Sequence, residues 1–128
     1  MATTLSGGLI RPFAGLRPRP DRAAAVLAPP YDVLSSAEAR ERAQGHPDSF
    51  LHVSKPEIDL PSETDPYAEA VYAQGRQQLD RLWREGVLQR DPAPYYYVYR
   101  LTMGDHAQTG LVAAASVAAY DQNRIRKH

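Results

Sequence analysis

The sequence predicts an α+β chain with a proline-rich N-terminal arm, two or three helices and an antiparallel hairpin. Three observations support this prediction. Most of the 11 prolines lie before residue 67, and proline fixes φ and removes a backbone donor, so this half favours loops and short elements. Residues 35–44 and 65–86 carry helix start and stop signals. Residues 95–101 are aromatic and β-branched, which is typical of a strand.

The N-terminal arm comes first in the chain. Residues 1–9 are mostly small and polar, and we expect them to be flexible. Residues 10–20 contain three prolines, which exclude the interior of a helix, so this segment should be extended. We expect Ile10, Phe13 and Leu16 to attach the extended segment to a core.

Several short elements are expected between the arm and residue 54. Asp21 should cap a short helix over Arg22–Leu27. The consecutive prolines that follow force extended backbone at Ala28 and Pro29. Ser49–Ser54 partly alternates between apolar and polar residues, so it predicts a short strand.

A clear helix signal begins at Ser35. Ser35 and Glu38 have capping-box spacing, which lets each side chain satisfy a free backbone donor of the other. The helix should end near Gln44, because Gly45 can adopt the left-handed conformation that commonly terminates a helix.

The strongest helix signal begins at Asp65 and Pro66. Aspartate caps helices, and proline is tolerated at the first helical position, where its missing donor costs nothing. Gly86 should end this helix, and we expect another element to pack close to Gly75. The buried stripe should consist of the apolar residues at helical spacing, namely Tyr67, Val71, Leu79, Leu82 and Trp83.

The C-terminal part predicts a hairpin. Tyr95–Leu101 should form its first strand, Gly104-Asp105 its turn and Ala107–Val117 its second strand. Tyr120–Asn123 predicts a further turn. Arg124–His128 begins another element, which we expect to be an incipient strand.

The composition argues against several classes of protein. There are 15 basic and 15 acidic residues, so we expect no nucleic-acid partner, because such proteins usually show a basic excess. The absence of cysteine excludes disulfides, thiolate zinc sites and cysteine nucleophiles. We expect no metal site, since the four histidines lack ligand spacing. No secretory signal opens the chain and no apolar run approaches about 18 residues, so we expect a cytoplasmic protein without membrane contact.

Six sequence blocks occur in one order and together carry a family resemblance: IRPFAGLRP, APPYDVLS, SFLHVSKPEIDLP, YVYRLTMG, QTGLV and RIRKH. Their succession resembles the opening of domain-of-unknown-function family 1015, over residues 10–128. Members of that family are longer than this chain. The resemblance therefore implies that residues 10–128 are the N-terminal portion of a larger protein, incomplete at its C-terminus.

The same resemblance implies an activity. The family carries an Asp-Gly-His-His-Arg stretch that these 128 residues lack. That stretch resembles one in the ParB/sulfiredoxin-like superfamily, which includes kinases acting on free serine. The intact protein would then transfer phosphate from a nucleotide, with magnesium, to a small hydroxylated metabolite such as serine, using catalytic groups beyond His128. The alternative is a non-catalytic ParB-like nucleotide-binding or regulatory module.

Four residues are candidates for substrate binding. Tyr31 and Asp32 follow two prolines, so a rigid loop could present a phenol and a carboxylate to a substrate; alternatively, Tyr31 packs and Asp32 caps a turn or helix. Lys127 and His128 would, by the resemblance, stand beside a catalytic carboxylate and contact phosphate. Alternatively, Lys127 and His128 form the charged end of a strand that is exposed to solvent.

A second group of polar residues lies between the two longer helices. His52 alternates with apolar neighbours, and we expect it to be packed or exposed rather than a ligand. Lys55, Glu57 and Asp59 form a charged segment. They could line a cleft, but we expect them to form a solvated loop.

Overall fold

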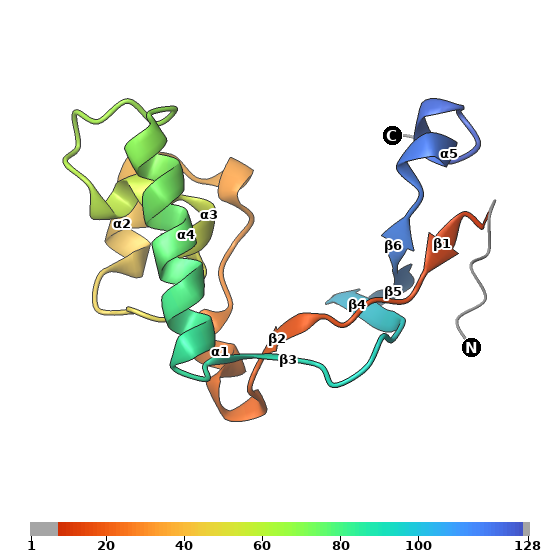
Figure 1. Cartoon of the computed structure of the whole chain (residues 1–128). Coiled ribbons are helices and arrows are strands. Elements are labelled where there is room, and N and C mark those ends of the chain that lie inside the picture. The colour runs from red at the N-terminus through yellow and green to blue at the C-terminus, as the bar shows by residue number, and fades with distance from the viewer. Residues whose placement is uncertain (1–7, 127–128) are drawn as a thin grey trace. The chain divides into compact units, whose positions relative to one another are not determined.

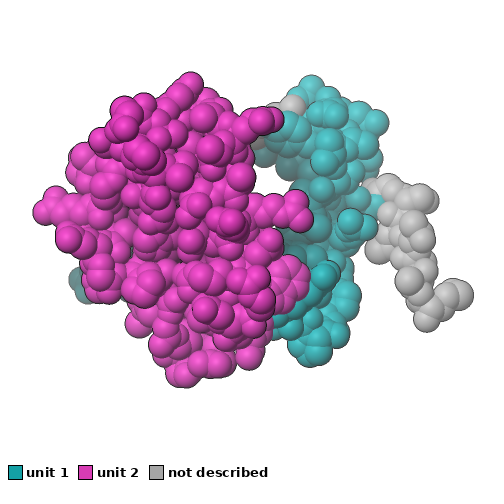
Figure 2. Space-filling model, turned by 60° about the vertical axis from the view of Figure 1, so that its left-hand side comes forward, with its two compact units in different colours: residues 1–15, 90–128 teal, residues 16–89 magenta. Residues whose placement is uncertain are grey.

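The computed structural model of the protein describes residues 8–126, and it confirms the predicted α+β class. Figure 1 shows the helices and strands along the chain. The chain divides into two compact units, one comprising residues 1–15 and 90–128 and the other residues 16–89. Figure 2 colours these units separately. Every element except β3 (Leu88–Arg90) lies within one unit.

The unit of residues 16–89 contains most of the helices. The long helix α4 packs against α3 and η3, and α2 packs against the same two elements. Strands β2 and β3 pair as a two-stranded sheet. The elements in chain order are β2 (Leu16–Pro18), η1 (Pro20–Arg22), α1 (Ala23–Val26), η2 (Tyr31–Val33), α2 (Ser36–Ala43), α3 (Leu51–Ser54), η3 (Pro56–Asp59), α4 (Glu69–Arg84) and β3 (Leu88–Arg90).

Helix α2 forms where its capping residues predict it. The Ser35 hydroxyl accepts a hydrogen bond from the Glu38 N–H at 3.2 Å. The Glu38 carboxylate accepts from the Ser35 hydroxyl at 3.1 Å. At the other end Gly45 has a φ of +76°, the left-handed conformation that a residue with a Cβ rarely adopts. The predicted start and end of this helix are therefore confirmed.

The predicted strand over Ser49–Ser54 is wrong, because this segment forms helix α3. The Ser49 hydroxyl accepts from the Leu51 N–H at 3.3 Å, and the Ser54 N–H donates to the Phe50 carbonyl at 2.9 Å. These local bonds satisfy the backbone without a partner strand. Leu51 is 2% exposed, so a single helical turn achieves the burial that the apolar residues require. A short apolar run does not distinguish the two structures.

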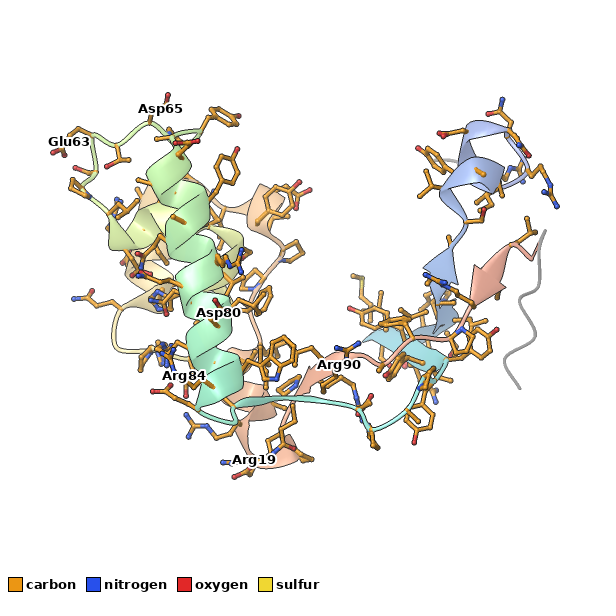
Figure 3. The ribbon with its side chains drawn as sticks, viewed as in Figure 1. Arg19, Glu63, Asp65, Asp80, Arg84 and Arg90 are labelled. Carbon is orange, nitrogen blue, oxygen red and sulfur yellow. The ribbon has the colours of Figure 1, made fainter. Side chains whose placement is uncertain are left out.

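Helix α4 begins later than predicted. Asp65 does not cap it; the Asp65 carboxylate accepts from the Tyr67 N–H at 3.0 Å and forms a turn ahead of the helix. Figure 3 shows Asp65 at this end of α4. The first helical residue is Glu69. Gly86, with a φ of +75°, follows the end of the helix as predicted.

The predicted burial of the apolar stripe on α4 is confirmed only in part. Val71 and Leu82 are 3% and 0% exposed, whereas Tyr67 and Trp83 are 81% and 44% exposed. Tyr67 lies outside the helix, and Trp83 lies beside the buried face rather than on it. Gly75 does face another element: a Cβ there would lie 3.2 Å from the Pro56 side chain.

Two apolar clusters form the core of this unit. The residues Val87 and Leu88 after α4 are buried in the first, and Leu16 packs against it. The first cluster contains Val26, Leu82, Val87 and Leu88. The second contains Ala39, Ala43, Leu51 and Ile58.

The short helix near Asp21 differs from its prediction. A 3-10 turn, η1, precedes α1, and the N-cap of α1 is Arg22, without a side-chain hydrogen bond. Asp21 instead accepts from the Arg19 guanidinium at 2.7 Å. This ion pair, in place of a cap, holds the pKa of the Asp21 carboxyl below its ordinary value.

The other unit contains the predicted hairpin. The seven-residue strands β4 (Tyr97–Met103) and β5 (His106–Val112) pair antiparallel, with Gly104 at a φ of +57° in the turn. Strand β1 (Ile10–Arg11) pairs with β6 (Ala114–Ala115), and α5 (Val117–Asp121) follows. Within the described part of the chain, no helix has the length and apolar character needed to span a bilayer.

Several C-terminal predictions need correction. The second hairpin strand ends at Val112 instead of Val117, because β6 leaves the hairpin and pairs with β1. Tyr120 belongs to α5, so the turn is shorter than predicted. Residues 124–126 form no strand, and the rest of that predicted element lies outside the described residues. The arm also differs, because Ile10 is 43% exposed and contributes backbone pairing more than burial.

Candidate functional site

Tyr31 and Asp32 lie on η2, directly after Pro30. Tyr31 is 62% exposed, so it does not pack. Asp32 is also exposed, and the residue that caps α2 is Ser35 instead. Within residues 8–126 no hydrogen bond or ion pair engages the Asp32 carboxylate. Both side chains are therefore open to solvent. The other two candidates, Lys127 and His128, lie outside the described residues.

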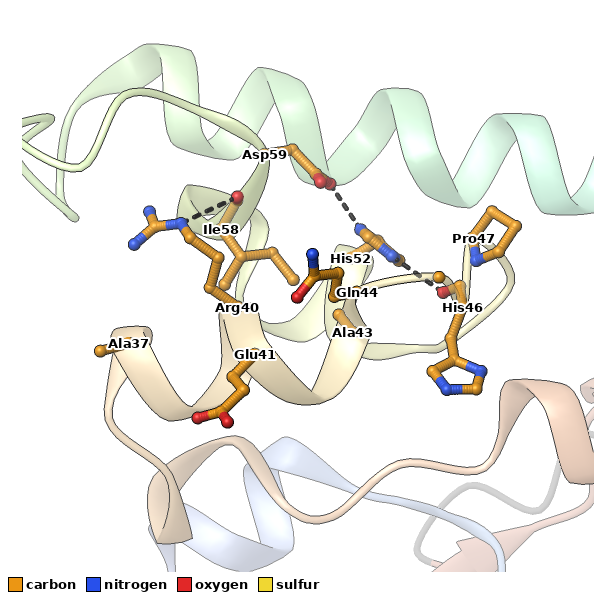
Figure 4. Close-up of a pocket in the computed structure, with 11 residues that line it drawn as sticks. Ala37, Arg40, Glu41, Ala43, Gln44, His46, Pro47, His52, Ile58 and Asp59 are labelled. Atoms are coloured by element: carbon orange, nitrogen blue, oxygen red, sulfur yellow. Dashed lines mark hydrogen bonds and ion pairs between the residues drawn. The ribbon is translucent and has the colours of Figure 1, made fainter.

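An open pocket lies in the unit of residues 16–89, with a volume of about 740 Å³. It is lined by α2, by the loop that follows α2, and by residues of α3 and η3 (Figure 4). Sequence reasoning missed this pocket. Its lining combines apolar side chains with charged and polar ones, among them Arg40, Glu41, Gln44, His46 and Asp59.

His52 is fixed by two hydrogen-bond acceptors. Its Nδ1 lies 2.7 Å from Asp59 Oδ2, and its Nε2 lies 3.0 Å from the His46 carbonyl oxygen. Both ring nitrogens are therefore engaged by oxygen atoms, and neither is available as a base or a ligand. Figure 4 shows this chain of contacts.

Glu57 is buried, so the prediction of a solvated loop is wrong for this residue. It is 9% exposed, accepts from the Ser36 hydroxyl at 2.9 Å and pairs with Lys55 at 3.2 Å. Burial raises the pKa of Glu57, but hydrogen bonds from its own backbone N–H, from Ser36 and from Lys55 outweigh burial. The pKa therefore lies below its ordinary value of 4.5.

Arg40 joins α2 to η3. Its Nε donates to the Ile58 carbonyl at 3.2 Å, and its Nη2 lies 3.1 Å from the Glu57 carbonyl and 3.4 Å from that of Leu60. These bonds satisfy carbonyls at the end of a short helix. The partners are about twenty residues away in the sequence, so no local signal could have indicated them.

Asp48 lies between two arginines. It is 8% exposed, pairs with Arg22 and lies 3.3 Å from Arg81 Nη1. Arg81 also donates to the Pro47 carbonyl at 2.6 Å and to Glu85 at 2.7 Å. A buried carboxylate needs such partners, because an unpaired charge in the interior is costly. This network connects the loop after α2 to η1 and α4.

In the other unit, Tyr97 is the centre of a small polar cluster. Its hydroxyl accepts from the Gly15 N–H at 2.7 Å, donates to Asp91 and lies 3.3 Å from the Phe13 carbonyl. The Phe13 and Tyr97 rings also lie 5.2 Å apart. The cluster gives a structural reason for the glycine in the first sequence block, since a Cβ at Gly15 would meet the Tyr97 hydroxyl at 2.7 Å.

No metal centre is evident in the part of the chain that the structure describes, because no three His, Asp or Glu side chains gather there. Comparison with known proteins gave one result. The model of a family described as "Protein of unknown function (DUF1015)" matches residues 10–128. Searches of curated proteins and of solved structures found no match.

Proposed function

Since the chain belongs to the DUF1015 family of proteins of unknown function, we propose that the intact protein is a nucleotide-dependent kinase of a small hydroxylated metabolite such as serine. Residues 10–128 are then its supporting portion, and the reactive centre lies elsewhere in the protein. One observation carries this division of roles. The buried or half-buried acids and bases described here are all engaged by structural partners.

A general acid or base must reach the proton that it transfers. His52 cannot, because both ring nitrogens are bonded. Glu57 is held by Ser36 and Lys55, and Asp48 by Arg22 and Arg81. Their removal would disturb the fold before it affected any reaction.

Tyr31 and Asp32 supply the substrate-side contact in this proposal. They are exposed on a short turn that Pro30 begins, and Asp32 has no partner within residues 8–126. A carboxylate in this state can accept a hydrogen bond from a hydroxyl group, and a proline-framed turn loses little entropy on binding. The nucleotide and the magnesium ion rest on the resemblance of the sequence blocks, and the cytoplasmic location rests on the sequence composition.

The experiment is nucleotide-dependent phosphorylation of a panel of hydroxy amino acids by the intact protein with magnesium. We expect transfer to one member of the panel. Asp32→Asn should raise KM severalfold and leave kcat nearly unchanged, because Asp32 contributes binding and not chemistry. Asp80→Asn is the matched control, since Asp80 is an exposed aspartate on α4 (Figure 3).

The second candidate is a non-catalytic ParB-like nucleotide-binding or regulatory module. It is favoured by the same engagement of acids and bases and opposed by the formal net charge of zero, since a DNA-associated protein should carry a basic face. Absence of turnover together with tight, nucleotide-dependent DNA binding would replace the kinase proposal with this one. Absence of DNA binding by the intact protein even at low salt would count against it.

A further inference from the structure

We propose that this chain forms a weak symmetric dimer in which strand β4 pairs antiparallel with β4 of a second copy. Leu101 lies at the centre of that pairing, and the two hairpins together form one four-stranded sheet. The inference concerns the hairpin and does not depend on the kinase proposal.

The outer edge of β4 is open. In an antiparallel pair every second residue directs its N–H and C=O away from the neighbouring strand. With the two-residue turn between Met103 and His106, the outward-directed residues of β4 are Val98, Arg100 and Thr102. All three are exposed, and none makes a backbone hydrogen bond to a described residue outside the hairpin. A row of unpaired backbone donors and acceptors is a template for another strand.

The hairpin lacks the features by which proteins usually prevent pairing at a sheet edge. Strands β4 and β5 pair over seven residues each without a bulge, and neither contains proline or lysine. Strand β4 is the stronger template of the two. Four of its seven residues are tyrosine, valine or threonine, against two of seven in β5, which also contains Gly110. We therefore assign the interface to β4.

Charge limits the register of the second copy. Arg100 is the only arginine, lysine, aspartate or glutamate in the two strands. In a two-fold pairing centred on Arg100, two guanidinium groups would lie directly opposite each other, which is destabilising. Centring the pairing on Leu101 instead places Arg100 opposite Thr102 of the second copy. Repulsion between the two arginines is then reduced.

Exposed apolar side chains favour the same register. Tyr99, Leu101 and Met103 are 58%, 55% and 84% exposed, and they share one face because side chains alternate along a strand. With Leu101 at the centre, each Tyr99 opposes Met103 of the other copy, and contacts between a thioether and an aromatic ring are favourable. A pairing centred on Tyr99 would move Met103 past the end of β4 of the second copy. It would also place Leu101 opposite Tyr97, whose hydroxyl is already bonded to the Gly15 N–H.

Cysteine cross-linking tests the register, because the chain contains no cysteine. Leu101→Cys should give a disulfide-linked dimer when oxidised glutathione is supplied as the oxidant. Residues directly opposite in antiparallel strands have Cα atoms about 4.5–5.5 Å apart, which is within the range of a disulfide. The product is measured on a non-reducing gel.

Gln108→Cys is the matched control, since Gln108 is exposed and opposes Leu101 on β5 of the same hairpin. In the proposed sheet the two copies of residue 108 lie three strand spacings apart, about 14 Å, which is too far for a disulfide. At equal chain concentration we expect at least tenfold less cross-linked dimer from Gln108→Cys than from Leu101→Cys.

Proline variants test the edge. Thr102→Pro removes an outward N–H of β4, and Ala107→Pro removes one on the far side of the hairpin, because Ala107 opposes Thr102. Both variants keep the hydrogen bonds between β4 and β5, so both should retain native circular dichroism. The pairing spans only about 17 Å, five residues of each copy, so the wild type should dimerise only as its concentration rises in analytical ultracentrifugation. Thr102→Pro should abolish this dimer, and Ala107→Pro should dimerise as the wild type does.

Three results would overturn the proposal. The first is a wild-type chain that sediments as a monomer at every concentration, which would leave the edge to a strand of another protein. The second is equal cross-linking of Leu101→Cys and Gln108→Cys. The third is a dimer that Thr102→Pro leaves intact, which would assign the contact to β5 or to a face of the hairpin. Should a proline variant lose its native circular dichroism, the cross-linking comparison decides.

Discussion

At the scale of single residues, Gly15 has the most restricted position. Its N–H donates to the Tyr97 hydroxyl, and a Cβ would lie 2.7 Å from that oxygen and 2.9 Å from the ring carbon bearing it. Gly15→Ala should therefore lower the free energy of unfolding by about 1–3 kcal/mol, as overpacking does. The urea-unfolding midpoint measures this loss.

Gly110→Ala is the control for that substitution. A Cβ added at Gly110 would lie 3.9 Å from its nearest neighbour, the Tyr99 carbonyl oxygen, which is an ordinary van der Waals contact. The control should leave the midpoint nearly unchanged. Equal midpoints for both variants would show that the contact between Gly15 and Tyr97 does not constrain the fold.

Glu57 gives a prediction about pH. Its folded pKa lies below the unfolded value of 4.5, so ionised Glu57 stabilises the fold above that pH. This contribution is lost as the pH falls through the folded pKa. Glu57→Gln should be less stable than the wild type near neutral pH, and its urea midpoint should depend less on pH between about 5 and 3. Glu63→Gln, an exposed control, should follow the wild type; the same pH dependence in both variants would contradict the assignment.

At the scale of elements, the cap of α2 can be tested directly. Ser35→Ala removes the hydroxyl that accepts from the Glu38 N–H. The expected loss is about 1 kcal/mol in the free energy of unfolding, as for other serine caps. Ser62→Ala in the exposed loop before α4 should change it by less than about 0.5 kcal/mol. A loss of equal size in both variants would argue against the cap.

The helices also show how far local sequence signals can predict the elements of this chain. The bounds of helix α2 were predictable because both signals are local. Ser35 caps the first turn of the helix, and Gly45 follows its last turn in the left-handed conformation. The start of α4 was not, because aspartate forms both helix caps and free turns, and Asp65 forms the latter. Helix α3 was missed because six residues contain too little periodicity to separate a strand from a helical turn.

The pocket and its surroundings were beyond local prediction for a related reason. Arg40 and the Ile58 carbonyl are 18 residues apart, and Arg81 and Asp48 are 33 residues apart. Such pairs form only after the elements pack, and neither residue carries a signal for its distant partner. The exposure of Tyr31 and Asp32 likewise depends on how the rest of the chain packs around them, which the local sequence does not show.

At the scale of the whole molecule, the hairpin leaves apolar side chains exposed on both of its faces. Val98, Leu101, Met103 and Leu111 are 75%, 55%, 84% and 61% exposed. Leu101 and Met103 share one face and Val98 and Leu111 the other, because side chains alternate along a strand. An isolated two-stranded hairpin is marginally stable at best, and exposed apolar strands favour association.

We therefore expect the 128-residue chain, expressed alone, to self-associate as its concentration rises in analytical ultracentrifugation. Replacement of Met103 and Leu111 by lysine should reduce the association. Tyr67→Lys, at an exposed position of the other unit, should not. A wild-type chain that stays monomeric with a sharp, two-state melt would contradict this expectation.

The division between a supporting portion and a separate reactive centre is tested most directly by one rate comparison. The intact protein and the isolated 128-residue chain are each given radiolabelled ATP, magnesium and L-serine, and the phosphorylated product is measured. Our account predicts product from the intact protein and none above background from the isolated chain. Product formed by the isolated chain at the rate of the intact protein would contradict it.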